Sequence, residues 1–141
     1  MAGNIGPANG EPHNDRQRIV IVDDHSGLLK LIEVLLTDEG YAVDTMTSTA
    51  GSHVRIKEIK PDLLILDMIL ETPDAGWQFL QAMKLDPQTN DIPIIVCSGA
   101  SHLLNLHRER LDQLNCYILP KPFDLDDLVD MSRLAISESL A

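Results

Sequence analysis

Short apolar runs alternate with helical patterns along the chain from Arg18 onward. The runs are rich in Val, Ile and Leu and are bounded by Asp, Gly or Pro, which is typical of buried strands. They lie at residues 19–22, 42–46, 63–66, 94–97 and 117–119. Because 63–66 is apolar at every position, the pattern indicates a parallel sheet that is covered by helices on both faces.

Helical stripes separate these runs. The clearest has apolar residues three and four apart and ends before Gly40. A weaker stripe spans 49–60, where Pro61 ends it. A further helix begins after Asp124, a suitable N-cap. The predicted buried positions of the five helices are Leu28, Leu31, Ile32, Leu35 and Leu36; Val54, Ile56 and Ile59; Trp77, Leu80 and Met83; Leu104, Leu111 and Leu114; and Leu125, Leu128 and Val129.

Five strand-and-helix units in succession predict an α/β fold, a doubly wound parallel sheet with right-handed crossovers. We expect one domain over 18–141, preceded by a disordered polar lead over 1–17. Ligands of such sheets bind outside the carboxyl ends of the strands, where the strand order reverses. The residues that end the strands are therefore the first candidates for a functional site.

The composition narrows the class of protein. No apolar run approaches the ~20 residues that span a bilayer, and the N-terminus has no signal-like stretch, so we expect a cytoplasmic protein without membrane contact. A net charge of -11 and the lack of a basic stripe predict no direct nucleic-acid binding.

The cysteines and histidines do not suggest a soft metal site. Cys97 and Cys116 lie in or beside apolar segments without CxxC spacing, which favours reduced structural thiols over a disulfide or a metal pair. The histidines are scattered, without the i, i+4 pair of a helical zinc site, and we expect solvated side chains. They are His13, His25, His53, His102 and His107.

Polar residues gather at the ends of the predicted strands. Asp23 and Asp24 follow the first, Asp67 the third, Ser98 the fourth and Lys121 the fifth. Three carboxylates at one rim repel each other, by about 4 kcal/mol per pair at ~4 Å and an effective dielectric near 20. An all-oxygen site of this kind suits Mg²⁺. With a lysine and a hydroxyl for phosphoryl oxygens, the set predicts phosphoryl transfer onto a carboxylate.

At these positions the sequence resembles the receiver domain of bacterial response regulators in two-component signalling. The matching segments are Ile-Val-Asp23-Asp24, Leu-Leu-Ile-Leu-Asp67, Cys-Ser98-Gly-Ala and Pro-Lys121-Pro-Phe, and the likeness extends over 18–140. The resemblance implies a flavodoxin-like receiver fold with five parallel strands in the order 2-1-3-4-5. It also implies a cis peptide between Lys121 and Pro122.

The resemblance assigns a role to each site residue. Asp67 is implied to be the phosphoacceptor, and Mg²⁺ is held by Asp23, Asp24, Asp67 and the backbone carbonyl of Ile69. Lys121 and Ser98 are implied to contact the phosphoryl group. The expected donor is a sensor histidine kinase or a histidine phosphotransfer protein, and phosphorylation is expected to switch partner or output interactions. Such a domain is a signalling phosphoacceptor rather than an enzyme with a separate substrate.

Three features depart from the family pattern. The loop after Asp67 carries Glu71 where proline is common, and apolar Ile69 cannot orient an attacking water. The aromatic residue expected three positions before Lys121 is replaced by Ile118, with Tyr117 beside it. We expect Ile118 to be an ordinary core residue, and a one-residue shift that presents Tyr117 instead stays open.

Other function classes are less consistent with the sequence. A hydrolase of the haloacid dehalogenase type needs a second acid where Ile69 stands. A nucleotide-binding domain needs a glycine-rich strand-to-helix turn, and neither GxGxxG nor GxxxxGK[ST] occurs. A phosphorylation-independent pseudo-receiver that serves as a docking module remains the alternative.

Overall fold

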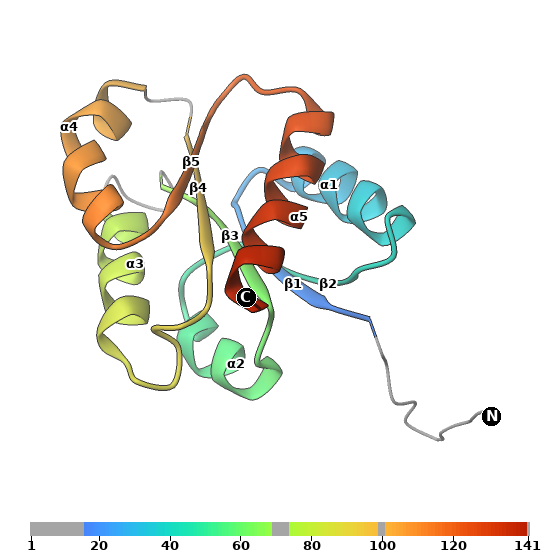
Figure 1. The fold of residues 1–141 in the computed structure, drawn as a ribbon, viewed down its shortest axis with the longest axis horizontal. Helices are drawn as coiled ribbons and strands as arrows, with labels where there is room; N and C mark the ends of the chain where they lie inside the picture. Colours follow the sequence, from blue (N-terminus) through green and yellow to red (C-terminus); the bar gives the residue numbers. More distant parts are fainter. Residues whose placement is uncertain (1–15, 69–73, 99–100, 141) are drawn as a thin grey trace.

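The computed structural model describes residues 16–68, 74–98 and 101–140, with the side chains of 101–106 left out. Most of the predicted lead, 1–15, therefore lies outside the described residues. Within them the strands form one parallel sheet in the order β2-β1-β3-β4-β5, which confirms the predicted fold (Figure 1). The strands are β1 (Arg18–Val22), β2 (Ala42–Met46), β3 (Leu63–Asp67), β4 (Ile94–Ser98) and β5 (Tyr117–Pro120).

Helices cover both faces of the sheet. They are α1 (Ser26–Asp38), α2 (Ser52–Ile59), α3 (Ala75–Leu85), α4 (Ser101–Gln113) and α5 (Leu125–Leu140). Helices α1 and α5 pack on one face, and α2, α3 and α4 pack on the other (Figure 1). A separate apolar cluster lies between each face of the sheet and its helices, since alternate residues of the strands point to opposite sides. No helix in the described part of the chain is long and apolar enough to cross a bilayer.

The predicted apolar stripe of α1 is wrong at one position. Leu31 is 50% exposed, whereas Leu29, outside the predicted stripe, is 4% exposed. Helix α1 buries Leu29, Ile32 and Leu36, which are spaced three and four apart. The helix has more leucines than its contact with the sheet can cover. The leucines that face the sheet most directly are buried, and those at the sides of the apolar stripe stay exposed.

Helix α2 departs from the prediction in the same way. Val54 was expected in the core but is 64% exposed, while Ser52 and Ile56 are buried one helical turn apart. Ile59, the last residue of the predicted buried face, is half-buried. In α5, Leu128 and Val129 are buried and Leu125 is half-buried. The carbonyl of Asp124 accepts the first helical hydrogen bonds of α5, from Asp127 and Leu128.

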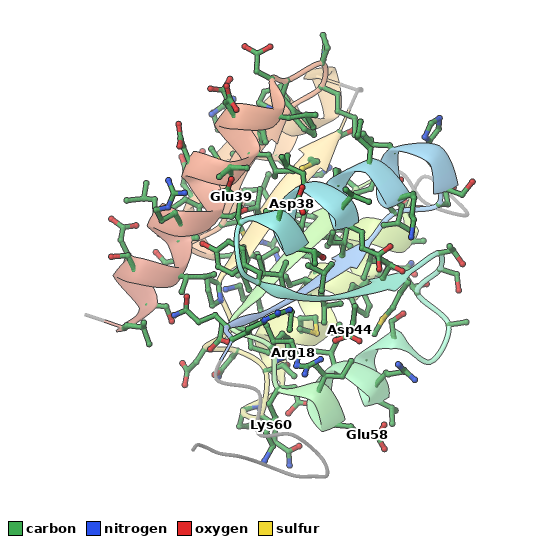
Figure 2. The ribbon with its side chains drawn as sticks, turned by 90° about the vertical axis from the view of Figure 1, so that its right-hand side faces the viewer. Arg18, Asp38, Glu39, Asp44, Glu58 and Lys60 are labelled. Carbon is green, nitrogen blue, oxygen red and sulfur yellow. The ribbon has the colours of Figure 1, made fainter. Side chains whose placement is uncertain are left out.

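Ion pairs and side-chain hydrogen bonds fix the edge of the sheet where β1 begins. The Arg18 guanidinium lies 2.7 Å from Asp44 in β2, and the Arg18 N–H donates to Asp62, just before β3, over 2.8 Å. Figure 2 shows Arg18 and Asp44 side by side at the start of β1. Because these contacts tie β1 to both of its neighbours, they hold the register on which the opposite rim depends.

Candidate functional site

Four strands bring the predicted site residues to one rim of the sheet. Asp23 follows β1, Asp67 ends β3, Ser98 ends β4, and Lys121 follows β5. Strands β3 and β4 each extend one residue beyond the predicted run, so Asp67 and Ser98 belong to the hydrogen-bonded sheet. Asp67 is paired with Cys97 across β3 and β4. Strand pairing therefore sets the backbone at Asp67 and Ser98, whereas Asp23 and Lys121 lie just beyond the ends of their strands.

The three predicted carboxylates form one group. Asp23, Asp24 and Asp67 each offer an oxygen within 4.8 Å of the others. Asp23 and Asp67 are 4% and 7% exposed, whereas Asp24 is exposed. Oxygen ligands at this spacing, with more negative charge than one lysine offsets, fit a hard divalent cation such as Mg²⁺. Ile69, the fourth predicted ligand, lies outside the described residues.

Asp23 is held by two hydrogen bonds to backbone groups that the sequence did not reveal. Its carboxylate accepts the N–H of His25 over 2.8 Å, and its own N–H donates to the Met46 carbonyl over 3.0 Å. The His25 side chain is the N-cap of α1, because Nδ1 accepts the N–H of Leu28 over 3.2 Å. The prediction of a merely solvated His25 was incomplete, and its place just before a helical stripe was the available signal.

Lys121 completes the charged group. Its Nζ lies 3.2 Å from Asp67 and 3.3 Å from Asp23. Burial acts to lower the pKa of Lys121, but the charges of Asp67 and Asp23 and their hydrogen bonds outweigh it, so the pKa is raised. The ammonium therefore stays charged at neutral pH. The Lys121–Pro122 peptide is cis, as the resemblance implied.

Ser98 lies at the same rim and is fully buried. Its carbonyl accepts the N–H of Lys121 over 2.9 Å, which joins the ends of β4 and β5. The residue that follows it, Gly99, lies outside the described residues. Ser98 and Lys121 are thus held in fixed relation by the backbone.

Tyr117 and Ile118 point to opposite faces of β5. Ile118 packs in the cluster beneath α3 and α4, whereas Tyr117 packs in the cluster beneath α1 and α5. The hydroxyl of Tyr117 donates to the Glu138 carboxylate in α5. Ile118 is half-buried at the edge of its cluster, so the expectation of an ordinary core residue holds only in part, and Tyr117 is not shifted into its register.

The remaining predicted side chains are only partly as expected. Cys97 and Cys116 are free, and burial raises the pKa of their thiols to about 12 and about 11. Nε2 of His53 lies 3.0 Å from Asp86, so that imidazole is not simply solvated. His107 stacks on Trp77 and is likewise not free in solvent. His13 and the side chain of His102 lie outside the described residues.

Comparison with known proteins gives a consistent result. The sequence model of the response regulator receiver domain matches residues 19–133. A transcriptional regulatory protein KdpE of Staphylococcus aureus is 30% identical over 126 residues, which are 89% of this chain and 52% of that protein. A DNA-binding response regulator MtrA of Mycolicibacterium paratuberculosis is 25% identical, over 81% of this chain and 48% of its own length.

Solved structures agree on the fold. A CheY-like response regulator receiver domain protein from Methanospirillum hungatei superposes with a TM-score of 0.76 at 24% identity, covering 89% of this chain and 97% of that chain. The chain spans about half the length of the curated relatives described above. Since one of those relatives is a DNA-binding regulator, the expected lack of nucleic-acid binding is not supported. The chain belongs to the response regulator receiver domain family of two-component signalling.

Proposed function

We propose that this domain is a Mg²⁺-dependent phosphoacceptor that takes a phosphoryl group on Asp67. The observation that carries the proposal is the group of three carboxylates within 4.8 Å, two of them buried, with the Lys121 ammonium against Asp67 and Asp23. Buried carboxylates that repel each other are costly to assemble. A cation and a phosphoryl group that bind there would offset this cost.

Each residue of the site has its own role in the proposed reaction. Asp67 is the nucleophile, and its oxygen forms the new bond to phosphorus while the donor leaves with the electrons of the broken bond. Asp23, Asp24, Asp67 and the Ile69 carbonyl would hold Mg²⁺, which supplies charge neutralisation for the phosphoryl oxygens. Lys121 provides a second positive charge, and the Ser98 hydroxyl donates a hydrogen bond.

The donor and the output follow from the family. Response regulators pair with histidine kinases, and we propose that a sensor histidine kinase or a histidine phosphotransfer protein phosphorylates this domain. Phosphorylation then changes the interactions of the domain with a partner or an output domain.

The test is phosphorylation by acetyl phosphate with Mg²⁺, followed by intact mass. We expect the gain of one phosphoryl group, its loss in Asp67→Asn, and a much slower gain in Lys121→Met. Asp91→Asn is the matched control, because Asp91 is exposed in the turn before β4, away from the rim. Undiminished labelling of Asp67→Asn would overturn the assignment.

The same experiment tests the docking-module alternative. No observation favours a phosphorylation-independent pseudo-receiver, because Asp23, Asp24, Asp67 and Lys121 are brought together at the rim. A protein that gains no phosphoryl group at all would fit that alternative and refute the proposed function.

A further inference from the structure

Helices α3 and α4 are joined by a stacked aromatic contact. The rings of Trp77 in α3 and His107 in α4 lie 4.6 Å apart at an interplanar angle of 20°. One turn further along α4, the Arg110 guanidinium lies 5.7 Å from the centre of a Trp77 ring. Stacking and cation–π attraction both favour this arrangement. We call these three residues the Trp77 clamp.

The two clamped helices are the ones that follow Asp67 and Ser98. Helix α3 comes after β3, which ends at Asp67, and α4 begins at Ser101, just after β4 ends at Ser98. The end of β4 and the start of α4 are thus neighbours along the chain. The clamp connects that helix back to the chain after Asp67 by a route outside the charged rim.

The α3 side of the clamp is anchored. A Cβ at Gly76 would lie 2.3 Å from the backbone oxygen of Met68, so the start of α3 is pressed against the residue that follows Asp67. Trp77 comes next in sequence and packs at the edge of the cluster beneath α3 and α4. On the α4 side, His107 is half-buried and Arg110 is exposed. The anchored partner is Trp77, and the partners that can move with α4 are His107 and Arg110.

We propose that the Trp77 clamp holds α4 in the unphosphorylated position and opposes the approach of Ser98 to a phosphoryl group on Asp67. The inference rests on the proposed function. A phosphoryl group carries about 1.5 to 2 negative charges and three acceptor oxygens, which attract hydroxyl and N–H donors; the bond to phosphorus neutralises the carboxylate of Asp67. Closure of the β4 end on that group moves the start of α4, and the clamp has to loosen as it does so.

The clamp also accounts for the missing aromatic residue in β5. Ile118 is packed in the cluster beneath α3 and α4 and has few rotamers, so it cannot exchange between two positions. In this chain the aromatic contact that responds to phosphorylation is placed between α3 and α4 instead. Trp77 is the only tryptophan in the sequence, so its fluorescence reports the clamp directly.

The test compares His107→Ala/Arg110→Ala with the wild type and with Arg108→Ala. Arg108 is exposed on α4 beside His107, so the control removes a cation from the same helix without touching the clamp. Affinity for beryllofluoride, a phosphoryl mimic, is measured with Mg²⁺, and acetyl phosphate labelling is followed by intact mass. Urea unfolding confirms that each variant is folded.

We expect the double variant to bind beryllofluoride about five-fold more tightly than the wild type, a coupling at the lower end of the usual range. Beryllofluoride should shift the Trp77 emission of the wild type and of Arg108→Ala, and should leave that of the double variant unchanged. Equal affinity in all three proteins, or an emission shift that survives in the double variant, would overturn the clamp while labelling at Asp67 still supports the proposed function. A wild type that is not labelled at Asp67 would overturn both.

Discussion

Replacing Asp24 by asparagine should stabilise the protein without Mg²⁺ and abolish its stabilisation by Mg²⁺. Asp24 is the exposed member of the carboxylate group, and its oxygen lies within 4.8 Å of those of Asp23 and Asp67. Each repulsion is worth about 0.9 kcal/mol at that distance in a medium as polar as water. Salt screens these exposed interactions and lowers their sum, so the expected gain is about 1 kcal/mol.

Added Mg²⁺ should make the wild type more stable than Asp24→Asn. A ligand that binds only the folded state stabilises it by about 1.4 kcal/mol at ten times its dissociation constant. The wild type gains this stability when Mg²⁺ is added, whereas Asp24→Asn, with one ligand fewer, gains little at the same concentration. The variant should therefore be the more stable protein in a chelator and the less stable one in excess Mg²⁺.

Thermal unfolding in a chelator and in excess Mg²⁺ measures both effects. A gain of about 1 kcal/mol corresponds to a rise in Tm of about 4 °C for a domain of this size. Asp91→Asn is the control, because it removes the same charge from an exposed turn away from the carboxylate group. If Asp24→Asn and Asp91→Asn shift Tm equally under both conditions, the repulsion argument and the role of Asp24 as a Mg²⁺ ligand are both refuted.

Three further predictions concern the scaffold. Gly76→Ala should lower the free energy of unfolding by about 2 kcal/mol, since its Cβ would lie 2.3 Å from the Met68 oxygen. Gly27→Ala, whose nearest contact is at 3.8 Å, should raise the free energy of unfolding. Urea unfolding that ranks the two variants otherwise would contradict this. Ser132→Ala should raise the free energy of unfolding by about 1 kcal/mol, because the buried Ser132 hydroxyl has no hydrogen-bond partner among the described residues. A lower free energy of unfolding in the same urea assay would argue against this. The pKa of Tyr117 is raised from 10.0 to about 12 by burial and by its carboxylate partner, so the stability that it contributes is complete below pH 10 and is lost between pH 10 and pH 12. An NMR titration in which Tyr117 ionises near pH 10 would refute this.

The sheet and its rim were predictable because parallel strands leave a strong signal. A strand that is buried on both faces is apolar at every position, as in Leu63–Asp67 up to its last residue. The polar residue that ends such a run stands out, and the topology of a doubly wound sheet brings those ends together. Asp23, Asp67 and Lys121 could therefore be placed in one site from the sequence alone.

The helix faces and the longer-range contacts were less accessible. Leu31 and Leu29 are alike in sequence terms, and only the packing angle of α1 decides which of them is buried. The cap by His25 depends on where α1 begins, which a pattern fixes only to within a few residues. The stacking of Trp77 on His107 joins residues of two separate helices, and no periodicity in a single chain encodes such a pair.

The two outer strands of the sheet also determine how this domain can meet other proteins. Strands β2 and β5 stand at the ends of the sheet order, and an unpaired strand edge is a template on which another chain can add a strand. Strand β5 has only four residues and ends in Pro120, which has no N–H to donate, while β2 carries Asp44 in its ion pair with Arg18. Both edges are thus poor templates for strand addition and for fibril growth. We therefore expect partner proteins to bind at the rim that holds Asp67 or on the outer surfaces of the helices rather than along a strand edge.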